Sequence, residues 1–307
     1  MNATLDWFGC ATFRLTIGKL VIFLDAYLDR VPAAPQVGLR PEEVERADWI
    51  VVGHSHFDHL YGAERIAKRT GARILGSHET VRVMEAQGVP LDRMIPVAGG
   101  ERVRLSDDVV VDVYPSQHSC VWSQRVMSAS DQVCIGDLGL TLQEQQLRLH
   151  ELAAHFGTLG PDVIAHLKAS SQRTWGDGGA FVYHFRTPEG SVFYQDTSGH
   201  WSGILRDLRP DVAILAAAGR GNVDGEPIQG SLAQFVARQV DLLRPRRVVL
   251  SHHDDWLPGF SRAIDVKPIR DEIARVRPAT ELVEMGYGAA YPLFMGGTPC
   301  TTSRPAG

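Results

Sequence analysis

The chain has 307 residues, of which 44% are hydrophobic and 22% are charged, and this composition is typical of a globular enzyme with a large core. Its formal net charge of -5 argues against a general nucleic-acid-binding protein, because such proteins need a basic surface. The four cysteines form no C-x-x-C pair, so neither a thiolate zinc knuckle nor a redox dithiol is indicated.

The N-terminus has no basic segment followed by an apolar stretch, so we expect no signal peptide. The longest apolar runs, such as residues 212–218, have the length of a strand and are too short for a membrane span. We therefore expect a cytoplasmic protein that acts on a small molecule, does not bind nucleic acid and has no membrane span. Assembly into a homo-oligomer is left open.

The first half of the chain alternates short apolar strands with stretches of helical periodicity. A helix over 59–70 is expected to end at Gly71, and Pro41 with two following acids is typical of a helix start. The other elements expected here are strands at 12–16, 20–25, 49–52, 72–76, 102–105 and 109–114, and a helix near 79–87.

Residues 119–178 interrupt this alternation. Thr141-Leu-Gln-Glu144 is a capping-box pattern, and the apolar residues that follow share one face, so a helix is predicted over 141–157. Because the segment begins directly after His118, we expect a lid over the active site; a helical insertion that only packs on the core is the alternative.

The second half repeats the mixture of strands and helices. A hairpin is expected from 180–185 and 191–194, around a turn at Pro188-Glu-Gly190. Further strands are expected at 212–217, 247–251 and 280–284, with helices at 231–243 and 266–276. Two halves of this kind fit a single α/β domain over residues 1–307, built as a four-layer αββα sandwich with a helical insertion.

The segment Val51-Val-Gly-His54-Ser-His56-Phe-Asp58-His59 carries the strongest chemical signal. A buried strand ends, a glycine allows a sharp turn, and four potential metal ligands follow within six residues. Imidazole and carboxylate are ligands that suit Zn²⁺, and iron or manganese in related geometries. Side chains two residues apart project alike in an extended loop, whereas His59 turns the other way, so one loop can serve two metal ions.

The pattern H-x-H-x-D-H resembles the signature of the metallo-β-lactamase superfamily, and the likeness covers most of the chain apart from 119–178. The family pattern also requires a histidine, an aspartate and a final histidine, each after a later strand. His118, Asp196 and His252 follow predicted strands in that order. The opening Trp7-Phe-Gly-Cys10-Ala-Thr-Phe13 resembles the ascorbate-6-phosphate lactonase-like and phospholipase-like branches, which commonly carry Gly-His-Ala-Thr there.

The resemblance implies a site for two divalent metal ions, with Zn²⁺ expected and Mn²⁺ or Fe²⁺ as alternatives. His54, His56 and His118 would hold the first ion. Asp58, His59 and His252 would hold the second, and Asp196 would bridge the two. Asp25 resembles an aspartate of the family that orients a ligand.

Three further positions are less determined. His253 is the neighbour that could replace His252, which we favour because it comes first after its strand. His200 is a weaker candidate that we place on the pocket wall. Cys10 stands where the related branches have histidine, so the role of that position does not transfer.

The implied activity is two-metal-dependent hydrolysis, in which a hydroxide bridging the metals attacks a small ester, lactone or phosphodiester. Asp58 is the expected catalytic residue, since it could relay the proton after the attack. The acid at Asp196 is typical of lactonases, thioesterases and phosphodiesterases of this fold, so β-lactam hydrolysis would be a side activity. An iron-dependent oxidoreductase of the dioxygenase kind is the alternative.

Two groups of residues bear on the substrate. If tryptophans line the pocket, an apolar or acyl-bearing substrate is favoured, and the candidates are Trp122, Trp175, Trp201 and Trp256. If basic residues of the insertion point inward, a phosphate or carboxylate is favoured, and the candidates are Arg125, Lys168 and Arg173.

Overall fold

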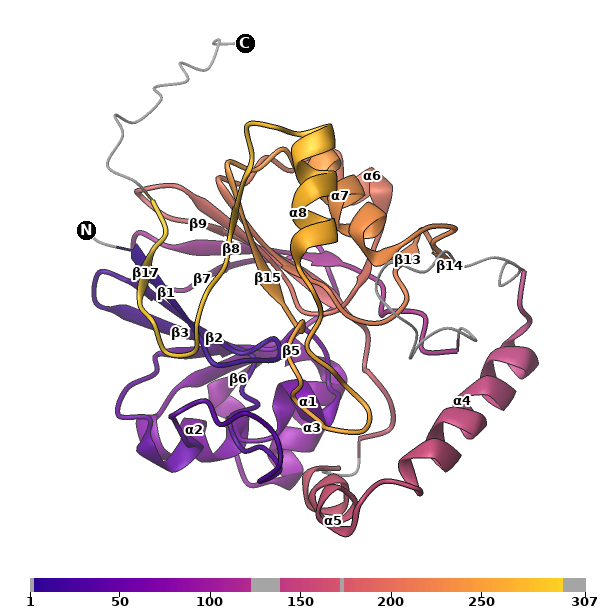
Figure 1. Cartoon of the computed structure of the whole chain (residues 1–307). Coiled ribbons are helices and arrows are strands. Elements are labelled where there is room, and N and C mark those ends of the chain that lie inside the picture. Colours follow the sequence, from indigo (N-terminus) through magenta and orange to yellow (C-terminus); the bar gives the residue numbers. More distant parts are fainter. Residues whose placement is uncertain (1–2, 123–138, 172–173, 295–307) are drawn as a thin grey trace.

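Two seven-stranded sheets lie face to face in the computed structural model, with helices on both outer faces (Figure 1). The structure describes residues 3–122, 139–171 and 174–294. Within these ranges no helix combines the length and the apolar character needed to cross a membrane.

The first sheet comes from the N-terminal half, except for one strand near the C-terminus. Its order is β17–β1–β2–β3–β4–β5–β6. Helices α2 (Ala63–Thr70) and α3 (His78–Ala86) follow β4 and β5 along the chain. The strands are β1 (Ala3–Trp7), β2 (Phe13–Ile17), β3 (Leu20–Leu24), β4 (Trp49–Val51), β5 (Arg73–Ser77), β6 (Met94–Val97) and β17 (Tyr291–Pro292).

The second sheet has the order β16–β15–β12–β10–β9–β8–β7, and α7 (Leu232–Leu243) and α8 (Lys267–Val276) accompany it. The short α6 (Ser202–Leu205) precedes β12. The strands are β7 (Arg102–Arg104), β8 (Val110–Pro115), β9 (Phe181–Arg186), β10 (Ser191–Gln195), β12 (Val212–Ala216), β15 (Arg247–Ser251) and β16 (Glu281–Val283). A small third sheet joins β11 (Gly199–His200), β13 (Asn222–Val223) and β14 (Glu226–Pro227).

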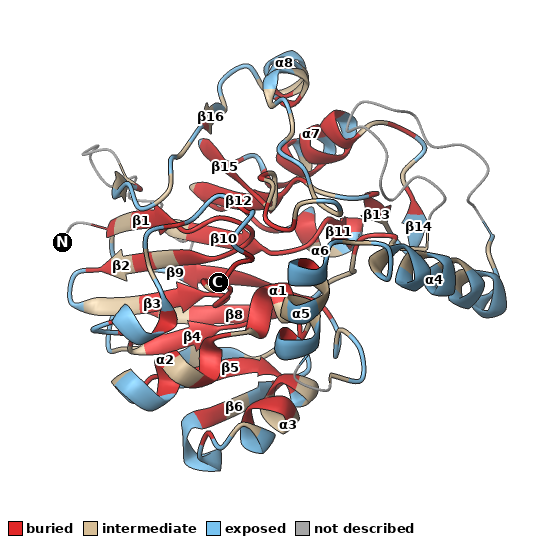
Figure 2. Cartoon of the chain, turned by 60° about the horizontal axis from the view of Figure 1, so that its bottom comes forward, coloured by how far each residue is buried: buried red, intermediate tan, exposed pale blue. Residues whose placement is uncertain are grey.

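The central strands are buried on both faces, as Figure 2 shows. In β12, Val212 and Ile214 point into the core between the sheets, whereas Ala213 and Leu215 point to the core under α7 and α8. Phe23 of β3 likewise contributes to the core under α2 and α3. Strands covered on both sides need continuous apolar runs, which explains the sequence pattern. The predicted αββα sandwich is confirmed.

One predicted helix is divided in two. The expected helix over 59–70 is wrong in its continuity, because α1 (Phe57–Leu60) ends before Gly62 and α2 begins at Ala63. Gly62 has φ 116°, and a Cβ on it would lie 2.7 Å from the carbonyl oxygen of Ala26. The break therefore depends on glycine and brings the α1 turn, which carries Asp58 and His59, against the first sheet.

The insertion contains two helices, α4 (Leu142–Phe156) and α5 (Pro161–Ser170). The predicted capping box is present, since Glu144 N donates to Thr141 Oγ1 at 3.3 Å and Thr141 N donates to Glu144 Oε2 at 2.8 Å. Figure 1 shows α4 beside the sandwich. The assignment of the insertion as a lid stays a prediction.

A buried histidine makes the stability of the fold dependent on pH. His200 packs against Phe235, with 5.4 Å between ring centroids, and burial lowers the pKa of His200 to about 4. This value lies below the pKa of a histidine in the unfolded chain. The stabilising free energy contributed by neutral, buried His200 is therefore fully present above pH 6.5 and is lost progressively as the pH falls towards 4.

We expect His200→Leu to reduce the loss of unfolding free energy between pH 7 and pH 5 by about 2 kcal/mol, because the leucine cannot be protonated. Denaturant unfolding at both pH values, with chelator present throughout, measures this difference. An unchanged pH dependence would contradict the assignment.

Candidate metal centre

The loop after β4 holds four of the seven predicted ligands. Gly53 permits this arrangement, because a Cβ there would lie 2.0 Å from the carboxylate of Asp196. Its amide donates to Asp25 Oδ1 at 2.9 Å, so the turn is fixed to the end of β3. His56 then precedes α1 as its N-cap residue.

His54, His56 and His118 form the first cluster, in which one ligand atom from each lies within 4.8 Å of the others. His54 Nε2 is 3.0 Å from His56 Nδ1. His118 donates from Nδ1 to the carbonyl of Ser119 at 2.9 Å, which leaves its Nε2 free. Burial lowers the pKa of all three imidazoles, so they are neutral at pH 7, which is the form that binds metals.

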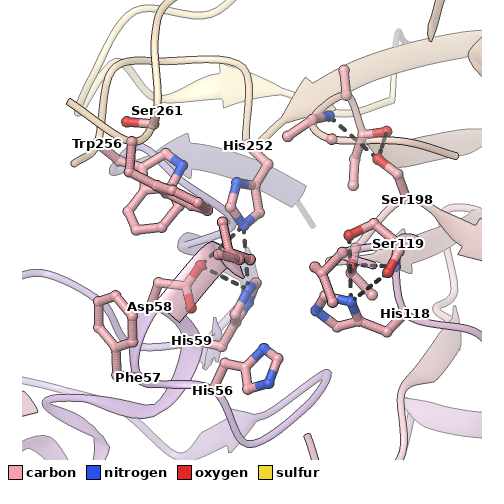
Figure 3. A pocket seen from close by; sticks show the side chains of 18 of the residues that line it. His56, Phe57, Asp58, His59, His118, Ser119, Ser198, His252, Trp256 and Ser261 are labelled. Atoms are coloured by element: carbon pink, nitrogen blue, oxygen red, sulfur yellow. Dashed lines mark hydrogen bonds and ion pairs between the residues drawn. The ribbon is translucent and has the colours of Figure 1, made fainter. Parts of the chain in front are cut away.

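Asp58, His59 and His252 form the second cluster together with Cys10. His252 Nε2 lies 3.3 Å from His59 Nε2 and 3.2 Å from Asp58 Oδ2. Cys10 Sγ lies 3.5 Å from the same nitrogen of His252. Figure 3 shows Asp58, His59 and His252 converging at the cavity.

Asp196 lies between the two clusters. It forms a third group with His54 of the first cluster and His59 of the second. Its Oδ2 is 2.6 Å from His54 Nδ1 and 3.4 Å from His59 Nδ1. Its Oδ1 is buried and has no hydrogen-bond partner within the described parts of the chain. All seven predicted ligands are thus brought together.

Asp25 orients His59, as the resemblance implies for that position. Its Oδ2 accepts hydrogen bonds from His59 Nδ1 at 2.6 Å and from the Tyr194 hydroxyl at 2.7 Å. These bonds fix the His59 ring with Nε2 facing the second cluster. The sequence signal for Tyr194 was only its place in a strand that leads to Asp196.

The charges of the site fit metal cations. Three buried carboxylates, Asp25, Asp58 and Asp196, lie among imidazoles, and buried charge requires a partner of opposite sign. Burial disfavours the charged form of His59 and by itself would lower its pKa. The nearby carboxylates of Asp58 and Asp25 have the larger effect and raise the pKa of His59 well above its ordinary value. Divalent cations would supply this positive charge and would also fill the partnerless side of Asp196 Oδ1.

The alternative histidines lie elsewhere. His253 stacks on Trp7 with 4.6 Å between ring centroids and takes no part in the clusters. His200 is not among the residues that line the cavity, contrary to the expectation of a pocket-wall residue. Cys10 lies in the second cluster, although the sequence analysis assigned it no role. The only indication in the sequence was that a cysteine stands where the related branches have histidine.

A cavity of about 430 Å³ opens over the two clusters (Figure 3). Its wall includes Leu149, Leu152, Ala153 and Phe156, so α4 of the insertion contributes to it. Other parts of the wall come from the end of β12, the start of α7 and residues 256–264. The aromatic and aliphatic side chains of these parts are Ala216, Ala217, Ala218, Leu232, Trp256, Phe260 and Ile264.

The lining of the cavity shows which of the predicted tryptophans and basic residues could contact a substrate. Of the four tryptophans, Trp256 lines it, whereas Trp175 is exposed, with the Arg82 guanidinium over its ring. Lys168 is exposed and does not line it, and Arg125 and Arg173 lie outside the described residues.

Comparisons with known proteins agree with this fold. Residues 21–149 match the model of the "Beta-lactamase superfamily domain" family, a range that includes the first-loop ligands and His118. A "UPF0173 metal-dependent hydrolase" of Pyrobaculum islandicum is 34% identical over 115 residues, which cover 38% of this chain and 50% of that protein. The chain thus spans about half the length of the curated relatives that it matches first.

Solved structures share the whole architecture. Igni18, a metallo hydrolase of Ignicoccus hospitalis, superposes with a TM-score of 0.62 at 16% identity, covering 95% of this chain and 98% of its own. CmlA, a diiron β-hydroxylase of Streptomyces venezuelae, has a TM-score of 0.57 at 15% identity, covering 95% of this chain and 54% of its own. Part of the chain is thus similar to the β-lactamase superfamily domain, and its four-layer fold is that of these solved metallo-β-lactamase-like structures.

We expect Asp25→Asn to weaken zinc binding roughly 10–100-fold, because a neutral amide orients and polarises His59 less strongly than a carboxylate. Competition with a chromophoric chelator measures the affinity. The matched control is Asp241→Asn, which changes a half-exposed carboxylate paired with Arg277 on the surface. Equal affinities for the two variants would contradict the orienting role.

Proposed function

We propose that the chain is a metal-dependent hydrolase that uses two divalent cations to cleave an ester, lactone or phosphodiester bond in a small molecule. The observation that carries the proposal is the pairing of two ligand clusters through Asp196 beside an apolar cavity that residues of both clusters line. The description of the Pyrobaculum relative as a metal-dependent hydrolase supports it.

The protein's own groups have separable roles in this proposal. His54, His56 and His118 would hold one cation, and Asp58, His59 and His252 the other. When bound, such a pair lowers the pKa of water towards neutrality and polarises a substrate oxygen. Zinc is the cation that this mixture of imidazole and carboxylate fits first, with manganese or iron as alternatives.

Asp58 is the group best placed to move a proton. It lines the cavity, and its Oδ2 contacts His59 and His252 at 3.4 and 3.2 Å. We propose that it accepts the proton released during attack on the substrate and passes it to the leaving group. A general acid–base role of this kind contributes on the order of 10²–10⁴ to a rate.

The wall of the cavity favours a substrate with an apolar body. Of the described residues that line it, Arg262 alone carries a permanent positive charge, and the polar groups other than Arg262 and the candidate metal ligands are hydroxyls. Apolar walls with few polar groups are typical of sites for small organic molecules. We therefore rank an ester or lactone with an apolar acyl part ahead of a phosphodiester.

An iron-dependent oxidoreductase remains the second candidate. CmlA shares the fold and is described as a diiron β-hydroxylase, so the architecture also accommodates iron chemistry. Metal analysis and oxygen uptake separate the two candidates. Substrate-dependent oxygen consumption by the iron-loaded protein would support oxidation, whereas turnover without oxygen supports hydrolysis.

We expect turnover of at least one substrate in a panel of lactones, p-nitrophenyl esters and bis-p-nitrophenyl phosphate. Chelator should abolish it, because the attacking water is then no longer acidified, and zinc should restore it. Asp58→Asn should lower kcat by about a hundredfold or more, whereas Asp241→Asn should not. Chelator-insensitive turnover, or no turnover after metal reloading, would overturn the proposal.

The contribution of α4 to the cavity can be tested by making the same substitution, leucine to alanine, on two different faces of the helix. Leu152 lines the cavity, whereas Leu147 is exposed and does not. Leu152→Ala should raise KM roughly tenfold with little change in kcat, because it removes an apolar contact made equally in the ground and transition states. Leu147→Ala should leave both parameters unchanged, and identical kinetics for both variants would contradict this role of the helix.

A further inference from the structure

Cys10 occupies a position that the proposed ligand set does not use. It lies in the turn between β1 and β2, is fully buried, and places its sulfur among Asp58, His59 and His252. These four residues come from three distant parts of the chain. One ligand atom from each lies within 4.8 Å of all the others.

The distances from His252 to the other three ligand atoms, and from His59 to Asp58, match the edges of a tetrahedron around a metal ion, whereas the Cys10–Asp58 distance is longer. With bonds of about 2.0 Å to nitrogen and 2.3 Å to sulfur, a tetrahedral cation sets two nitrogens about 3.3 Å apart and sulfur about 3.5 Å from nitrogen. The His59–His252 separation is 3.3 Å and the Cys10–His252 separation is 3.5 Å. Asp58 Oδ2 lies 3.2 Å from His252, 3.4 Å from His59 and 4.0 Å from Cys10.

The backbone holds the sulfur in this place by several independent contacts. Cys10 N donates to Asp254 Oδ1 at 2.9 Å, and Cys10 O accepts from His252 N at 2.7 Å and from Trp7 Nε1 at 3.1 Å. Asp254 is itself paired with the buried Arg30 at 2.8 Å. The turn that carries the cysteine is therefore tied directly to the loop that carries His252.

The backbone conformation of Cys10 also indicates a functional role for this residue. Its φ is 46°, in the left-handed region where glycine costs least, and His252 has φ 63°. A non-glycine residue there costs about 1–3 kcal/mol and persists only where the surroundings impose it, most often at functional sites. Packing alone would favour glycine at this turn.

We propose that Cys10 is a protein ligand of the second cation, bound through its thiolate beside Asp58, His59 and His252. This inference rests on the metal site proposed above. As the sulfur–metal bond forms, the thiol proton leaves to solvent. The two sites then differ, because apart from the shared Asp196 the second has four protein ligands including sulfur, whereas the first has three imidazoles and keeps more room for water and substrate. A thiolate also favours zinc or iron over manganese at the second site.

Cobalt(II) distinguishes a thiolate ligand from a nearby thiol. The wild-type protein loaded with two equivalents should show an intense near-ultraviolet sulfur-to-cobalt charge-transfer band. Cys10→Ser should lose this band. Cys120→Ser, which changes the other buried cysteine of the described residues, should retain it.

Cys10→His provides a second variant in case serine destabilises the turn. An imidazole can still bind a cation, so this variant should bind two equivalents of metal without the charge-transfer band. Zinc titration of the same proteins should show a weakened second equivalent in Cys10→Ser and an unchanged first one.

The outcomes separate this inference from the proposed function. Two bound equivalents without the band in wild type, or a band that persists in both Cys10 variants, would overturn the role of Cys10 and leave the hydrolase proposal standing. Failure of the wild type to bind any cobalt or zinc would overturn both.

Discussion

The burial of Asp25, Asp58 and Asp196 among five imidazoles is the constraint on which the site depends. Carboxylates removed from water need positive charge close by, and within the cluster only imidazole protons supply it. Neutral histidines suit metal binding, whereas the raised pKa of His59 marks the place where positive charge is required. Divalent cations satisfy both requirements at once, which is why the geometry favours a metal centre over a purely protein-based acid–base site.

The sandwich brings these groups together because strands of both sheets end at the same side. Asp25 and the loop from His54 to His59 follow β3 and β4 of the first sheet. His118, Asp196 and His252 follow β8, β10 and β15 of the second. Neither sheet alone carries a complete cluster, so the apolar core between the sheets is also what holds the two halves of the site in register.

The sequence predicts those parts that depend on local spacing. The ligands of the first loop lie within six residues, and continuous apolar runs identify strands covered on both faces. The division of the helix at Gly62 was missed because it depends on Ala26, 36 residues away in the chain, crowding that glycine. The place of Cys10 beside His252 was missed for the same reason, since it results from contacts across 242 residues.

Backbone strain and ligand placement are connected in this molecule. Of the five described non-glycine residues with positive φ, three are Cys10, Asp25 and His252, and all three belong to the second cluster or contact it. Each costs about 1–3 kcal/mol, which the cores on either side must offset. A bound cation would stabilise the folded state and not the unfolded chain, so metal binding and folding would be thermodynamically coupled. The strained residues lie at the site where the cation would bind.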